Sequence, residues 1–187
     1  LFSVTGESTV DQSVFIFIRK NGGEYLTYLY GKVLPLGSSQ IEYKAAMNAG
    51  NMDWQSLEKW REVKEHGDTA PELRKAQGWI AEQLLTGTES TLAFAKQKLF
   101  DRDQLKETRI IFGGGGHCEY PYKAAVMKPF AGQLFAQPLT PDVVSLPPPR
   151  DLELKVSETR WMRRLSVAYG LSFEKSMLSN FIYPNDV

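Results

Sequence analysis

The tripeptide NGG at residues 21–23 separates two runs rich in β-branched and aromatic residues, 13–19 (SVFIFIR) and 25–33 (YLTYLYGKV). Runs of this composition are typical of strands. Asn and Gly tolerate the positive φ angles that a tight hairpin turn requires, so the two runs predict an antiparallel hairpin. Residues 1–4 predict one more strand before it. The chain should therefore open as a three-stranded meander, which is incompatible with an all-helical bundle.

Helical patterns follow the meander. Residues 41–49 (IEYKAAMNA) predict a short helix, and residues 52–66 predict a second one, because apolar side chains recur there at three-residue steps. A long helix is predicted over about 71–100, with one apolar face that comprises Leu73, Ile80, Leu84, Leu92, Ala95 and Leu99. Thr69 and Glu72 have the spacing of a capping box, and Pro71 would occupy the first turn, where its missing N–H is harmless.

Strands and helices alternate in the second half. Residues 108–112 (TRIIF) predict a strand, and Pro121 can start a helix that runs to about Phe130. Residues 142–149 (DVVSLPPP) predict a strand that ends in a stiff polyproline stretch. A last helix is predicted from an N-cap at Ser157 to Gly170, and residues 172–187 are expected to be an extended tail.

This order predicts an α/β fold. A meander followed by alternating strands and helices is the layout of a ribonuclease H-like half, with a mixed sheet of about five strands and helices on both faces. The 187 residues fit a single domain spanning 1–187. Within it we expect a small helical insertion at about 40–70.

Charge and composition exclude several classes of protein. The net charge is zero, so no basic excess indicates nucleic acid as a partner. A single cysteine permits no internal disulfide and favours a reducing, cytoplasmic compartment. No run of apolar residues is long enough to span a membrane, and no signal-peptide pattern is present. A start at Leu1 suggests a fragment, a processed chain or a piece cut from a longer protein.

The first candidate site is the stretch VTGESTVD at 4–11. Gly6 permits a tight turn whose open N–H groups form a nest for anions. The residues expected to bind there are Gly6, Glu7, Ser8 and Thr9. Asp11 could hold a hydrated Mg²⁺, since hard cations prefer oxygen ligands. The alternative is a polar β-turn without a ligand.

The second candidate site is the glycine run after the strand at 108–112. It comprises Gly113, Gly114, Gly115 and Gly116, with His117 directly after it. Four glycines are entropically costly and suit a place where a flat or charged group approaches the backbone. The run matches neither a dinucleotide-binding fingerprint nor a P-loop. His117 could stack on a base or hydrogen-bond to it; the alternatives are a solvent-exposed histidine and a flexible glycine connector.

In their order and spacing these motifs resemble the second lobe of the actin, sugar-kinase and DnaK-type chaperone superfamily. Residues 4–11 resemble its second phosphate motif, D-x-G-x-x-T-x-D, with Gly6, Thr9 and Asp11 in register. Residues 110–116 (IIFGGGG) resemble its adenosine motif. Residues 165–171 (LSVAYGL) resemble its second connecting helix, with Ala168 and Gly170 as the small residues.

The resemblance implies a lobe that binds ATP or ADP with Mg²⁺ and works with a first lobe that this chain lacks. That first lobe, in the same protein or in a partner protein, carries the usual catalytic side chains, so no catalytic residue is assigned here. The isolated chain is therefore expected to be inactive. One position departs from the family pattern, because Val4 stands where the family has the carboxylate that orients the magnesium waters. Only a weak dependence on magnesium is therefore expected.

Two other functions stay open. The same fold could serve as a pseudo-ATPase or assembly module used for protein contacts. A ribonuclease H-like nuclease is the third possibility, but that chemistry needs several convergent carboxylates for two metals. Tyr120 and Tyr122 could wall an adenine pocket or only pack at a helix start. The tryptophans are expected in the core or at a lobe interface.

Overall fold

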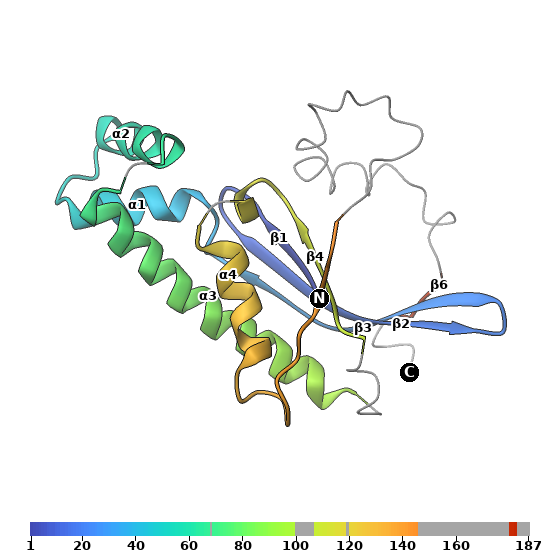
Figure 1. Cartoon of the computed structure of the whole chain (residues 1–187). Helices are drawn as coiled ribbons and strands as arrows, with labels where there is room; N and C mark the ends of the chain where they lie inside the picture. Colours follow the sequence, from blue (N-terminus) through green and yellow to red (C-terminus); the bar gives the residue numbers. More distant parts are fainter. Residues whose placement is uncertain (68, 100–106, 119, 146–179, 183–187) are drawn as a thin grey trace.

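The computed structural model describes residues 1–67, 69–99, 107–118, 120–145 and 180–182. Six strands form one sheet in the order β5-β4-β1-β2-β3-β6 (Figure 1). The strands are β1 (Phe2–Thr5), β2 (Val10–Lys20), β3 (Gly23–Leu34), β4 (Arg109–Gly113), β5 (Asp142–Val144) and β6 (Asn180–Ile182). The α-helices are α1 (Ser39–Asn48), α2 (Trp54–Glu65), α3 (Pro71–Gln97) and α4 (Tyr122–Met127).

The sheet is mixed, as the order of elements predicts. β2 pairs antiparallel with both β1 and β3, whereas β1 pairs parallel with β4, and β4 with β5. β6 joins the other edge, parallel to β3. Among the described strands β2 alone therefore runs against the rest. The predicted meander and the mixed α/β sheet are both confirmed.

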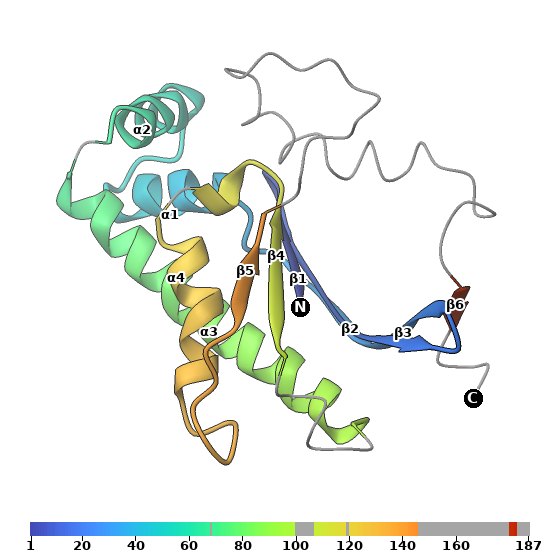
Figure 2. The ribbon, with the colours of Figure 1, turned by 45° about the vertical axis from the view of Figure 1, so that its right-hand side comes forward.

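The hairpin between β2 and β3 is longer than the sequence pattern predicts. Asn21 and Gly22 both have positive φ, 53° and 74°, which is what a two-residue hairpin turn needs. The ladder shifts register between Val14 and Phe15, and beyond this point the hairpin projects from the body of the sheet (Figure 2). Both strands extend beyond the predicted runs 13–19 and 25–33, because pairing continues through residues such as Asp11, Gln12 and Glu24 that carry no strand signature of their own.

The described helices cover one face of the sheet. α3 and α4 lie against the strands, α1 packs beside α3, and α2 lies on the outer side of α1 (Figures 1 and 2). The predicted apolar face of α3 is buried except at Leu99, which follows the helix. It packs with Val10, Ile110 and Phe112 from the sheet. The helix predicted from Ser157 to Gly170, and the residues from 146 to 179 as a whole, lie outside the described residues.

The start of α3 differs from the prediction. Pro71 is the first helical residue, so Ala70 is the N-cap, and no side chain caps the helix. Thr69 lies one residue too early to be the N-cap of a capping box with Glu72. The preference of proline for the first helical position therefore overrides the capping-box pattern.

Candidate functional site

The turn between β1 and β2 is as tight as the sequence predicts. The backbone N–H of Gly6 donates to the carbonyl oxygen of Thr9 at 2.9 Å, which closes the turn. The Thr9 hydroxyl donates to the Asp11 carboxylate, also at 2.9 Å. The Thr9 hydroxyl is therefore engaged in orienting the carboxylate of Asp11, the predicted magnesium ligand.

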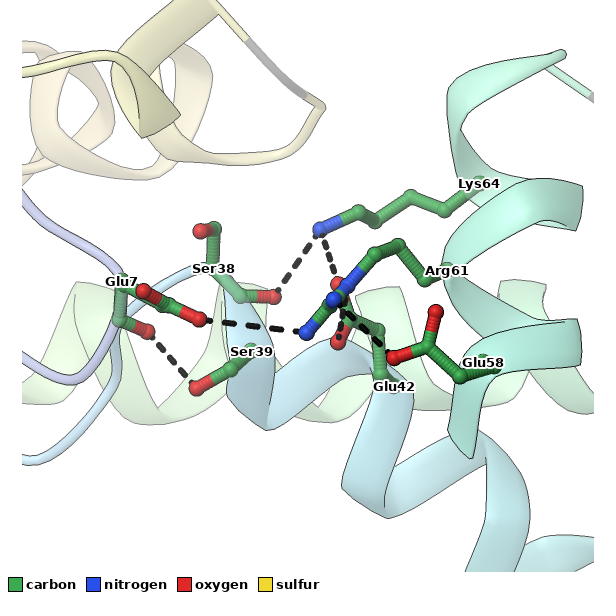
Figure 3. A network of polar contacts seen from close by, with 7 residues as sticks. All are labelled: Glu7, Ser38, Ser39, Glu42, Glu58, Arg61 and Lys64. Carbon is green, nitrogen blue, oxygen red and sulfur yellow. Dashed lines mark hydrogen bonds and ion pairs between the residues drawn. The ribbon is translucent and has the colours of Figure 1, made fainter. Parts of the chain in front are cut away.

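This turn docks through its carbonyl oxygens onto the start of α1. The backbone N–H groups of residues 37–39 donate, in order, to the carbonyl oxygens of Ser8, Gly6 and Glu7, at 3.1, 3.0 and 2.9 Å. The hydroxyl of Ser39 also donates to the carbonyl of Glu7 at 2.7 Å (Figure 3). The backbone N–H groups of Glu7 and Ser8 donate to no described residue, and both residues are exposed. The carbonyls are thus turned toward α1 and two amides are left open.

The glycine loop lies directly beside this turn. β4 runs parallel to β1 and ends at Gly113, opposite Val4, and Gly114 then takes a positive φ of 77°. A Cβ on Gly114 would overlap the carbonyl of Thr5, and one on Gly116 would lie 2.6 Å from the Thr5 methyl group. Glycine at 114 and 116 is therefore required by packing against β1, before any ligand is considered.

His117 is buried, which contradicts the solvent-exposed alternative. Only 5% of its surface is accessible, and its ring stacks on Phe112 with 5.7 Å between centroids. Its Nδ1 lies 2.7 Å from the carbonyl oxygen of Gly114. Its Nε2 lies 3.5 Å from the Cys118 sulfur, so one face of the ring and both nitrogens have contacts within the protein. Burial of this histidine follows from the 3₁₀ turn at Gly116–Cys118, which the sequence did not indicate.

A cavity of about 670 Å³ lies next to this loop, between α4 and β5. His117 and Tyr120 line it, with apolar side chains from both elements and Lys123 from α4. Tyr120 is largely exposed, whereas Tyr122 is fully buried in the core. Of the two tyrosines considered as walls of an adenine pocket, only Tyr120 lines this cavity. β5 lies within the strand predicted at 142–149, but its place beside β4 and this cavity was not predicted, because that depends on strand pairing distant in sequence.

An ion-pair network connects the β1–β2 turn to α2 (Figure 3). Arg61 on α2 lies 3.9 Å from the Glu7 carboxylate, 3.6 Å from Glu42 and 3.1 Å from Glu58. Lys64 forms a 2.7 Å ion pair with Glu42, and both of these side chains are almost fully buried. The sequence did not reveal this network, because its members lie on three separate elements.

The site offers few ligands for a metal. Among the described residues, no group of three or more His, Cys, Asp or Glu side chains could hold a metal ion. In the described part of the chain, no helix has the length and apolar character needed to cross a membrane.

Comparison with known proteins supports the fold. No family model matches the sequence, and no curated protein does. Among solved structures, a chain of the PilM-PilN type IV pilus biogenesis complex is similar, with a TM-score of 0.52 and 18% sequence identity. The match covers 91% of this chain and 44% of that chain, so this chain spans less than half of its neighbour's length. The chain therefore has an α/β, ribonuclease H-like (actin-like) fold with a mixed sheet.

Proposed function

We propose that this chain is a nucleotide-binding lobe that contributes a phosphate turn, Gly6–Thr9, and an adenosine loop, Gly113–His117. The observation that carries the proposal is the orientation of the turn. Its carbonyl oxygens are bound by residues 37–39, while the amides of Glu7 and Ser8 remain open. Successive open amides form a nest that attracts anions such as phosphate.

The position of the glycine loop supports the same proposal. β1 and β4 are parallel neighbours, so both loops extend from the same end of the sheet. Ligands of α/β proteins bind at the carboxyl ends of such strands. The cavity beside His117 and Tyr120 has a volume of about 670 Å³, within the usual range for small-molecule sites. An adenosine group is the ligand that we assign to it.

Magnesium plays a minor part in this proposal. Asp11 would hold water molecules around Mg²⁺, and Val4 offers no oxygen ligand where a second carboxylate is expected. ATP or ADP would therefore bind through amides and hydroxyls, with little help from the metal. Hydrolysis needs groups from a first lobe, because no catalytic residue is assigned in this chain.

The experiment is a titration of the chain with ATP, followed by calorimetry or by a fluorescent analogue. This chain supplies only one wall of the proposed cleft, and its contacts must first offset the translational and rotational entropy that ATP loses on binding. We therefore expect a dissociation constant for ATP of about 1 mM. Ser8→Pro removes one open amide and should weaken binding about tenfold. Ser39→Ala, which removes a hydroxyl that donates to the turn and no open amide, is the matched control and should bind ATP as the unmodified chain does. Equal affinities for Ser8→Pro and the unmodified chain would exclude the turn as the phosphate site.

A role as an assembly module is the second candidate. It is favoured by the similarity to a chain that is part of a two-protein complex, and by valine at position 4. Adding the first lobe separates the two candidates: ATP turnover by the completed protein supports an ATPase. Nucleotide binding without turnover, together with complex formation, supports an assembly module.

A further inference from the structure

Five large apolar side chains are exposed on α1, at the start of α2 and on the adjoining part of α3. The exposed fraction is 70% for Trp54 and 56% for Met47, and lower for the other three members. This set, which we call the α1–α2 patch, comprises Tyr43, Met47, Met52, Trp54 and Trp79. The tryptophans were expected in the core or at a lobe interface, and the exposure of Trp54 and Trp79 excludes the core for these two. Grouped exposed apolar side chains commonly mark binding sites.

The geometry of α1 brings these side chains together. Tyr43 and Met47 are one helical turn apart and so lie on the same face. The backbone N–H of Asn51 donates to the carbonyl of Ala46 at 3.1 Å, which folds the α1–α2 connection back against the end of α1. Met52 and Trp54 follow directly. The Lys44 ammonium lies 4.7 Å from the centroid of the Trp79 ring. This contact places Trp79 of α3 beside the α1 residues of the patch.

The patch is held on rigid elements. The opposite face of α1 is completely buried at Ile41, Ala45 and Ala46. α2 begins at an N-cap, Asp53, whose carboxylate accepts a 2.7 Å hydrogen bond from the Ser56 amide. Lys64 then fixes α2 to α1 through its buried ion pair. A preorganised surface loses less conformational freedom on binding than a flexible one does.

The charge of the patch indicates what it would bind. Lys44 lies against Trp79, and Lys75 lies one helical turn before Trp79 on α3. Neither lysine forms an ion pair with a described carboxylate. Glu82 lies one helical turn after Trp79 on α3, on the side of Trp79 opposite to Lys75. Two unpaired lysines beside exposed tryptophan and methionine favour an occupant that is apolar and acidic.

We propose that the α1–α2 patch docks an acidic amphipathic helix of a partner protein. Trp54 and Trp79 would act as anchors, because tryptophan dominates binding energy at interfaces. Met47 and Met52 would adapt to the apolar face of that helix. Lys44 and Lys75 would pair with its carboxylates. The surface is separate from the phosphate turn and the glycine loop, so the proposal does not depend on nucleotide binding.

The test uses two synthetic amphipathic helical peptides of about five turns. Both carry leucine and phenylalanine on one face, and the polar face carries glutamate in one peptide and lysine in the other. Fluorescence anisotropy of the labelled peptides should show at least about tenfold tighter binding of the acidic one. Double substitution Lys44→Glu and Lys75→Glu should reverse this order. Equal binding of both peptides, or no reversal, overturns the proposal.

Alanine variants locate the site. Trp54→Ala and Met47→Ala should each weaken binding of the acidic peptide about tenfold, since both remove exposed side chains of the patch. Phe17→Ala is the control, because Phe17 is also half exposed but lies in the projecting hairpin. It should leave the affinity for the acidic peptide unchanged. Loss of binding in all three variants, or in none, contradicts the assignment.

Photo-crosslinking identifies the occupant in the cell. A photoreactive residue at position 47 of the full protein should crosslink to an acidic segment of another protein. Crosslinks to residues 146–179 of the same chain, or to a second copy, would show that the patch is covered by the protein itself and would overturn the proposal.

Discussion

Val4 and Asp11 face one another across the β1–β2 ladder. Their neighbours Thr5, Val10 and Gln12 are buried, and the Gln12 amide donates to Thr88 of α3 at 2.8 Å. Since side chains alternate along strands, Val4 and Asp11 point to the face that the described helices leave uncovered. A carboxylate at position 4 would therefore stand directly beside that of Asp11.

Val4→Asp should create a magnesium response that the unmodified chain lacks. Two carboxylates on adjacent strands repel one another, so the variant should lose about 1 kcal/mol of stability without metal. Magnesium should restore much of this loss by bridging the two groups. Thermal unfolding with and without magnesium measures the effect. Ile18→Asp, at an exposed position of β2 opposite Tyr25 and away from Asp11, is the control and should show no response to magnesium.

The buried ion pair should matter far more than an exposed one. Lys64→Met leaves the Glu42 carboxylate buried with only the more distant Arg61, and should cost about 3 kcal/mol. Arg19→Ala breaks the exposed pair with Glu24 and should cost at most about 0.5 kcal/mol. Urea unfolding gives both values. Similar losses for the two variants would show that Lys64 and Glu42 do not form a desolvated pair.

Two glycines should respond in opposite directions to replacement by alanine. Gly114→Ala places a Cβ against the Thr5 carbonyl at a positive φ, and should cost more than about 2 kcal/mol. Gly78 lies within α3 with open space around its Cα, so Gly78→Ala should stabilise the chain by about 0.5–1 kcal/mol. Denaturant midpoints compare the two variants. A neutral Gly114→Ala would mean that the loop is not packed on β1 as described.

The fold was largely predictable because its signals are local. The turn at Asn21 and Gly22 fixes the hairpin, and the apolar face of α3 repeats over its whole length. From the order of these elements, the mixed sheet follows. The N-cap of α3 was predicted wrongly, because two capping signals overlapped and the Pro71 signal decided the outcome.

The site was predictable in position and less so in detail. Strand direction places the Gly6–Thr9 turn and the glycine loop at the same end of the sheet, and the pairing of β1 with β4 makes them neighbours. The burial of His117 depends on stacking against Phe112, and the role of Gly114 depends on its contact with Thr5. No local pattern encodes such contacts, nor the ion pairs that join Arg61 to the turn.

The most direct test of the proposed nucleotide site is the response of backbone amides to ATP, followed residue by residue by NMR. The amide signals of Glu7 and Ser8 should move most, together with those of the glycine loop at 113–117. The turn at residues 21–23 is the internal control and should not move. The same shifts should occur with and without magnesium, because Val4 supplies no metal ligand. If ATP leaves Glu7 and Ser8 unchanged while other regions respond, the turn is not a phosphate site, and the central claim fails.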